Sequence, residues 1–124
     1  MRTRRQLIEA ALRTLRVIAA GETIDSDDFA DVTEAYQGLH ANLRDRGIAY
    51  WPNTGADVEE IPEPVFRGLS MVLAVECADA YGKKPPLAFD DDGRQTGADV
   101  VGMRMLRRHV AKRPSGEPTP FSSY

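Results

Sequence analysis

Residues that could carry out chemistry are few in this chain and stand far apart. The two histidines, His40 and His109, are isolated, and neither an HExxH nor a CxxC pattern accompanies them. The single cysteine, Cys77, lies in an apolar run, which is typical of a buried thiol. The sequence also contains no Gly-Lys-Ser/Thr phosphate loop and no nucleophile elbow. We therefore expect a protein that is not an enzyme and that uses no metal and no cofactor.

One acidic segment comes close to a calcium-binding loop. Asp90, Asp92, Gly93 and Asp99 fit positions three, five, six and twelve of an EF-hand, whereas position one is Ala88. The twelfth position also carries aspartate instead of the bidentate glutamate of that motif. We interpret the segment as a solvated acidic turn.

A row of basic residues follows this turn and is the strongest candidate for a binding surface. It consists of Arg104, Arg107, Arg108, Lys112 and Arg113. Such side chains reach DNA phosphates and base edges, so a small DNA-binding or regulatory protein remains the alternative hypothesis. Two observations disfavour DNA binding: the pI is near 5.4, and no partner helix precedes the row across a short turn. A charged outer face on a core helix and a docking surface for an acidic protein explain the row equally well.

Four helices are expected to position these residues. Thr3 and Gln6 fit a capping box that starts a helix over 4–19, with Gly21 as its stop. A second helix begins in the acidic run 25–28 and ends before Gly47, and its apolar residues form a regular seam. That seam consists of Phe29, Val32, Tyr36, Leu39 and Leu43.

The remaining segments follow from turn chemistry and apolar spacing. Residues 48–62 are expected to form a loop in which Trp51 covers the core. An almost continuously apolar helix over 65–81, ended by Gly82, is expected to be central and buried. A long connection over 83–96 contains an apolar patch at 87–89 that could form an exposed arm, and a basic helix follows from Thr96 or Gly97.

The length of 124 residues and the apolar content of 42% are typical of one domain. We predict an all-α bundle of about four helices over 1–113 and an extended tail over 114–124, where three prolines oppose a helix. No apolar run reaches the roughly 18 residues of a membrane span. The N-terminal Met-Arg-Thr-Arg-Arg does not begin a signal peptide, so we expect the chain to stay inside the cell that makes it, without membrane contact.

Charge is distributed unevenly along the sequence, with both ends basic and the middle acidic. This segregation suits contacts between copies of the chain, in which an acidic surface of one copy meets a basic surface of the next, or steering towards a charged partner. The candidate residues for contacts between subunits are Arg4, Arg5, Asp27, Asp28 and Asp31.

The order of helix caps and apolar spacings over residues 3–82 resembles the head-tail connector (adaptor) proteins of tailed phages, which include the tail accessory factor, or packaged-DNA stabilisation protein, of short-tailed phages. The matching segments are Thr3 to Leu15, Gly21-Glu22-Thr23, Leu39 and Leu43 to Gly47-Ile48, and Ile61-Pro62 leading into Leu69 through Tyr81-Gly82. The sequence departs from the family pattern at Arg16, where the family often has glycine, at Arg44-Asp45, and in the segment 83–93.

The resemblance implies a structural virion protein, made in the host cytoplasm and located in the virion neck at the portal vertex. Such a protein forms a ring of twelve copies beneath the portal protein, lengthens the channel for packaged DNA without sequence-specific contact, and offers a docking surface to the stopper or tail protein. Under this hypothesis the row of basic residues near the C-terminal end, with Phe121 and Tyr124 of the tail, is expected to bind the portal.

Overall fold

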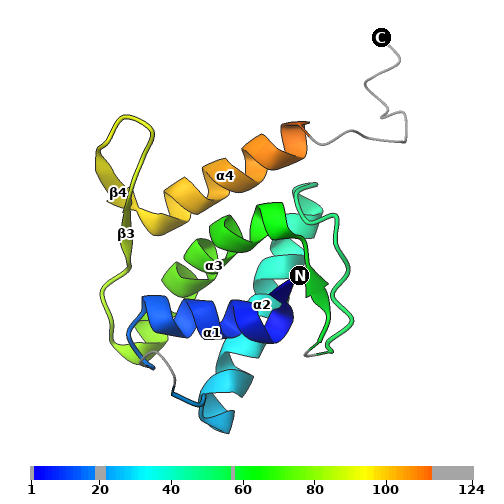
Figure 1. Ribbon diagram of the computed structural model, residues 1–124, viewed down its shortest axis with the longest axis vertical. Helices are drawn as coiled ribbons and strands as arrows, with labels where there is room; N and C mark the ends of the chain where they lie inside the picture. The colour runs from blue at the N-terminus through cyan, green and yellow to red at the C-terminus, as the bar shows by residue number, and fades with distance from the viewer. Residues whose placement is uncertain (1, 19–21, 57, 113–124) are drawn as a thin grey trace.

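The computed structural model describes residues 2–18, 22–56 and 58–112 and is mostly helical (Figure 1). The helices are α1 (Arg4–Thr14), α2 (Ser26–Asp45), α3 (Glu63–Ala78) and α4 (Ala98–Lys112), and a 3₁₀ turn, η1 (Asp79–Tyr81), extends α3. The strands are β1 (Arg2–Thr3), β2 (Glu60–Ile61), β3 (Leu87–Phe89) and β4 (Gln95–Gly97). The expected helical bundle is confirmed, but the class all-α is only approximate because the strands form two small antiparallel sheets.

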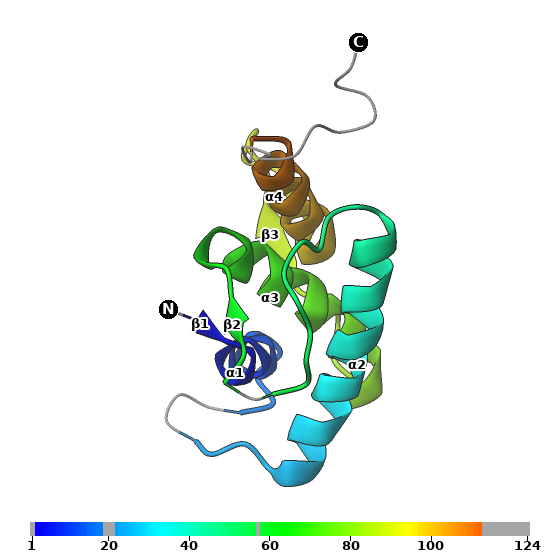
Figure 2. The same cartoon turned by 90° about the vertical axis from the view of Figure 1, so that its right-hand side faces the viewer.

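The expectation that the third helix is central is confirmed. Helix α3 packs against α1, α2 and α4, and the views in Figures 1 and 2 show these three helices arranged around it. Its side chains at Val65, Leu69 and Leu73 are completely buried. The predicted seam of α2 also faces this core, with Val32, Tyr36, Leu39 and Leu43 buried and Phe29 partly buried.

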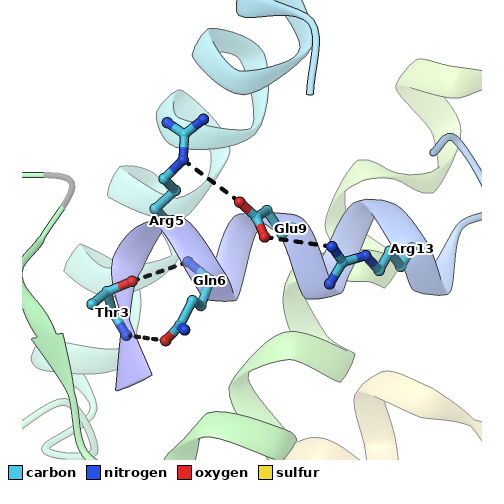
Figure 3. A network of polar contacts seen from close by, with 5 residues as sticks. All are labelled: Thr3, Arg5, Gln6, Glu9 and Arg13. Atoms are coloured by element: carbon cyan, nitrogen blue, oxygen red, sulfur yellow. Dashed lines mark hydrogen bonds and ion pairs between the residues drawn. The ribbon is translucent and has the colours of Figure 1, made fainter. Parts of the chain in front are cut away.

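The start of α1 forms as its sequence predicts. The Thr3 hydroxyl accepts a hydrogen bond from the Gln6 backbone N–H at 3.2 Å, and the Gln6 side-chain oxygen accepts one from the Thr3 N–H at 3.0 Å (Figure 3). These two reciprocal bonds are the expected capping box.

The predicted end of α1 at residue 19 is wrong, because the helix ends at Thr14. The Val17 N–H donates to the Leu12 carbonyl at 3.0 Å and Arg16 has φ of 60°, a Schellman motif with arginine in the left-handed position that glycine usually takes. The turn keeps Leu15 and Ile18 buried in the core although they leave the helix. Gly21 lies outside the described residues.

The end of α2 forms the same Schellman motif, here with the expected glycine in the left-handed position. Gly47 has φ of 75°, and the Ile48 N–H donates to the Leu43 carbonyl at 2.8 Å. The two helices therefore end with the same hydrogen bonding, once at a glycine and once at an arginine.

The connection over 83–96 contains a β-hairpin, which the sequence interpretation missed. Strand β3 pairs with β4 in antiparallel register from Leu87 opposite Gly97 to Phe89 opposite Gln95. In the turn, the Asp90 carboxylate accepts the backbone N–H groups of Asp92 and Arg94 at 3.0 and 2.9 Å. The expected exposed arm is therefore an ordered hairpin that leads directly into α4.

A pair of glycines sets the distance between α3 and α4. A Cβ atom on Gly102 would lie 2.5 Å from the Gly68 carbonyl oxygen, and one on Gly68 would lie 2.8 Å from the Gly102 oxygen. The backbones of the two helices thus touch where they cross, and any larger residue at either position would force them apart.

Candidate interaction surface

Helix α4 lies at the edge of the molecule and buries only a narrow stripe of its surface (Figure 2). The stripe consists of Ala98, Gly102 and Leu106, at helical spacing towards α3. The opposite face carries Arg104, Arg107, Arg108 and Lys112, all exposed, and we call these four residues the basic face. Arg113, which the sequence places next in the row, lies outside the described residues, as do Phe121 and Tyr124 of the tail.

The basic face has an apolar element as well. Val100 is 46% exposed and, with Met103 and the first arginines of the row, lines a shallow hollow of about 550 Å³ on the outer side of α4. Cations beside exposed apolar atoms are typical of protein-binding surfaces, because such a surface buries apolar area and pairs charges in one contact.

One member of the basic face is already engaged within the chain. The Arg108 guanidinium pairs with the Asp91 carboxylate of the hairpin turn at 2.7 Å. This hydrogen bond and the positive charge hold the pKa of Asp91 below its usual range. Arg108 therefore ties the tip of the hairpin to α4, and the nearby charge of Arg104 also acts on Asp91.

The residues expected at subunit contacts divide into exposed and buried ones. Asp27 and Asp31 are exposed on the first turns of α2, where a subunit contact could reach them. Asp28 is half-buried and accepts a hydrogen bond from the Tyr81 hydroxyl at 3.3 Å. Burial of the Tyr81 hydroxyl and the nearby charges of Asp28 and Asp31 raise the pKa of that tyrosine.

The expectation of a subunit contact through Arg4 is wrong for this fold. Arg4 is 2% exposed, and its guanidinium donates a hydrogen bond to the Gly55 carbonyl in the loop before β2. The side chain holds the loop against α1 and does not reach the surface. Arginine in an amphipathic helix is usually exposed to solvent, so the burial of Arg4 could not be predicted from the sequence.

Arg5 lies on the surface in a small charged network. It pairs with Glu9 at 3.5 Å, and Glu9 also pairs with Arg13 at 3.6 Å, as Figure 3 shows. The Arg5 guanidinium also stacks 5.0 Å from the centre of the Phe29 ring on α2. Because Arg5 keeps an exposed side chain, it can still contribute to a contact between copies.

The acidic and basic surfaces lie at different ends of the molecule. In Figures 1 and 2 the first turns of α2, which carry Asp27 and Asp31, lie at the end opposite α4. The basic face is thus separated in space from Asp27 and Asp31, whereas Arg5 of α1 contacts Phe29 in the same first turns of α2.

The fold also forms a cluster of aromatic side chains that contains both histidines, which sequence reasoning missed. The Trp51 carbonyl accepts a hydrogen bond from His40 Nε2 at 2.7 Å, and Trp51 Nε1 donates to the Tyr36 hydroxyl at 3.0 Å. The Tyr50 hydroxyl lies 2.9 Å from Nε2 of His109 on α4. The adjacent aromatic residues at 50 and 51 were the available signal, but only the fold brings residues 11 to 59 positions apart together.

The centre of this cluster is buried. Trp51 is 4% exposed, which confirms that it covers the core, and burial raises the pKa of Tyr36 to about 12. Cys77 is buried as expected, and burial raises the pKa of its thiol to about 11, with smaller contributions from Glu76 and Asp31. Protonated hydroxyl and thiol groups of this kind pack and hydrogen-bond in the core.

Within residues 2–18, 22–56 and 58–112, no group of three or more histidine, cysteine, aspartate or glutamate side chains is arranged to hold a metal ion. No helix in these same ranges is long and apolar enough to cross a membrane.

Comparison with protein-family models, with curated proteins and with solved structures finds no match to this chain. The arrangement itself defines a small helical protein with one outer helix, a hairpin beside it and charged surfaces at separate ends. Its function must be argued from those surfaces.

Proposed function

We propose that the protein is a structural connector of a phage virion, which forms a ring beneath the portal protein and uses α4 to dock. The observation that carries the proposal is the basic face of α4. It is exposed, it borders the apolar hollow at Val100, and it lies at the end of the molecule away from the acidic turns of α2. The resemblance over residues 3–82 supports the same function.

The charge layout supports repeated contacts between copies. A contact that joins Asp27 and Asp31 of one copy to exposed basic residues of α4 on the next copy uses two different surfaces. A heterologous contact of this type continues from copy to copy and closes into a ring when the rotation permits. In the proposed ring of twelve copies, DNA passes through the centre without sequence-specific contact and the lower side receives the stopper or tail protein.

The proposal is tested by expressing the chain with the portal protein encoded beside it in the same genome. The molar mass of the purified complex is measured by light scattering, and its shape is imaged by electron microscopy. We expect a ring of this chain on the portal, and we expect the double variant R104E/R107E to lose it, because four units of charge change on a desolvated docking surface.

A matched control is the double variant K83E/K84E, which reverses the charge of two exposed lysines away from α4 and so changes the net charge equally. It is expected to join the portal normally, and both variants are expected to melt like the parent, since all four side chains are exposed. Undiminished joining by R104E/R107E would exclude α4 as the docking surface. Failure of the parent chain to join any portal protein would refute the connector function itself.

The alternative, a DNA-binding or regulatory protein, is favoured by one observation, the exposure of four basic side chains on a single helix. Against it, α4 follows a β-hairpin, whereas a recognition helix usually follows another helix across a short turn. A mobility-shift measurement with duplex DNA decides between them. DNA binding by α4 would weaken steeply with salt and would be lost in R104E/R107E, and a connector should show neither effect at physiological salt.

A further inference from the structure

Strand β3 has a free edge, and a flanking hydrogen bond shows which of its backbone groups face that edge. The Ala98 N–H donates to the Pro86 carbonyl at 2.9 Å, so these two residues form a bonded pair at the end of the ladder. Bonded and unbonded pairs alternate along an antiparallel ladder, so Leu87 and Phe89 stand in the pairs that do not bond to β4. Their N–H and C=O groups therefore point away from β4.

The same two residues expose their side chains. Leu87 is 61% exposed and Phe89 is 68% exposed, although both are large and apolar. The hairpin that carries them lies at one side of the molecule (Figure 1). A short strand that combines unpaired backbone groups with exposed apolar side chains is a site at which another strand can add.

The edge of β3 is complementary to itself. When a two-fold axis passes through Ala88, Leu87 of each copy stands opposite Phe89 of the other, and each such pair exchanges both of its N–H···O=C bonds. A register displaced towards the amino end of the strand would place Phe89 opposite Pro85, which has no N–H to donate. The backbone pattern therefore favours the register centred on Ala88.

The side chains suit the same register. Each exposed leucine would pack against an exposed phenylalanine of the other copy, and aliphatic–aromatic pairs of this kind stabilise antiparallel strands. At the axis, the two copies of Ala88 form an unbonded pair, in which Cα atoms approach to about 4.5 Å. The small methyl group of alanine permits this approach.

The charges that flank β3 change sign along the chain. Lys83 and Lys84 precede the strand, Asp91 and Asp92 follow it in the hairpin turn, and all four are exposed. Antiparallel pairing brings the acidic turn of each hairpin beside the basic base of the other, so opposite charges meet at both ends of the contact. Asp92 is the freer of the two acids, because Asp91 also pairs with Arg108 of its own chain.

We propose that β3 is the contact surface of a two-fold dimer, in which the hairpins of two copies join edge to edge into one continuous antiparallel sheet. This dimer goes beyond the proposed function, because a two-fold contact joins two copies and does not continue around a cyclic ring. It is the form of the free chain, and the pair separates before its copies enter the ring.

The dimer is tested by sedimentation equilibrium of the full chain over a range of concentrations, with no portal protein present. The parent is expected to pass from monomer to dimer, and the double variant L87S/F89S should raise the dissociation constant about tenfold or more, because it removes the apolar side chains at the contact. V100S is the matched control, since it removes an exposed apolar side chain of α4, and should dimerise like the parent.

Two results of this measurement would overturn the proposal. One is a parent that stays monomeric up to about 1 mM, or that assembles into rings without forming a dimer. The other is a loss of association in V100S as large as that in L87S/F89S, because the contact would then not lie at β3.

The register is tested with Ala88→Cys under oxidising conditions. Two thiols at the axis lie within the reach of a disulfide, so this variant should form a covalent dimer. Val100→Cys and the parent should not, because position 100 lies outside the contact and Cys77 is buried. A parent that dimerises while Ala88→Cys remains reduced would exclude the pairing centred on Ala88.

The antiparallel direction is tested by exchanging the flanking charges. K84E and D92K should each weaken the dimer, and the double variant K84E/D92K should restore it, because opposite charges again meet across the contact. A double variant weaker than either single one would show that the base of one hairpin does not meet the turn of the other. Since none of these assays contains a portal protein, their outcomes are separate from that of the proposed function.

Discussion

The molecule has two parts that use their apolar residues differently. In the three-helix core, formed by α1, α2 and α3 with β1 and β2, most of the large apolar side chains of the helices are buried, many of them completely. In the outer unit, formed by the hairpin and α4, only Ala98, Gly102 and Leu106 are buried, while Leu87, Phe89 and Val100 are exposed. The core therefore accounts for stability, and the outer unit presents a surface.

The difference has a physical consequence for the fold. Burial of apolar area is the main favourable contribution to folding, and the outer unit contributes little of it. Its attachment rests on the close crossing at Gly68 and Gly102, on the apolar side chains of Leu106, Met103 and Val110, and on the hydrogen bond between Tyr50 and His109. We expect the outer unit to open before the core does.

The largest effect is expected from a cavity in the core. Leu73 on α3 is completely buried, so Leu73→Ala should lower the free energy of unfolding by about 2–5 kcal/mol. Urea unfolding followed by circular dichroism measures this change. A truncation to alanine at an exposed position of the outer unit, Val100→Ala, should change it by less than about 0.5 kcal/mol, and similar losses at both sites would remove the contrast between the two parts.

A second test addresses the attachment of the outer unit with a pair of glycine substitutions. Gly102→Ala places a Cβ 2.5 Å from the Gly68 carbonyl and should destabilise the contact between α3 and α4 by about 1–3 kcal/mol. Gly38→Ala lies within α2, where nothing stands within 4 Å of the new atom, and should stabilise the protein by about 0.5–1 kcal/mol. Opposite shifts of the melting temperature are therefore predicted, and shifts of equal sign would show that the helices do not cross as closely as described.

A third test compares the two helix ends. Arg16 has φ of 60°, which costs an L-residue about 1 kcal/mol or more, so Arg16→Gly should raise the free energy of unfolding by about 1 kcal/mol. Gly47→Ala makes the reverse change at the end of α2 and should lower it by a similar amount. Denaturant unfolding of both variants gives the two values, and a loss on Arg16→Gly would mean that the arginine side chain has a role that outweighs its backbone cost.

These helix ends also show what the sequence could reveal about the fold. The capping box at Thr3, the glycine after α2 and the apolar run of α3 are local signals, and the structure confirms all three. The early end of α1 was missed because an arginine in the left-handed conformation has no sequence signal, whereas Gly21 has one. The hairpin was missed because its strands are only three residues long and are joined by Asp90 to Arg94 instead of a two-residue Asn-Gly turn.

The candidate site was predictable only in part, for a similar reason. The exposure of Arg104, Arg107, Arg108 and Lys112 follows from the helical period of α4 and is confirmed. The burial of Arg4 and the pairing of Arg108 with Asp91 depend on which loop or turn the fold brings alongside. Contacts across 51 and 17 positions carry no local pattern, so sequence reasoning alone had no basis for them.

The smallest effect concerns the charge pair that joins the hairpin to α4. Arg108 keeps the pKa of Asp91 low, so the pair stabilises the hairpin above the ordinary aspartate pKa, and this contribution is lost as the pH falls through the lowered value. In Arg108→Gln the pKa of Asp91 should rise towards its ordinary value. Carboxyl chemical shifts followed by NMR titration measure it, and an unchanged pKa would show that the pair does not form in solution.

The central claim, that the outer unit is a separate and weaker part of the fold, is tested most directly by native-state hydrogen exchange at increasing denaturant. We predict that the amides of α4 and of the hairpin exchange together through one partial opening with a lower free energy and a weaker dependence on denaturant. The amides of α3, α2 and α1 should exchange together only at the free energy of global unfolding. A single free energy shared by α4 and α3 would contradict the account.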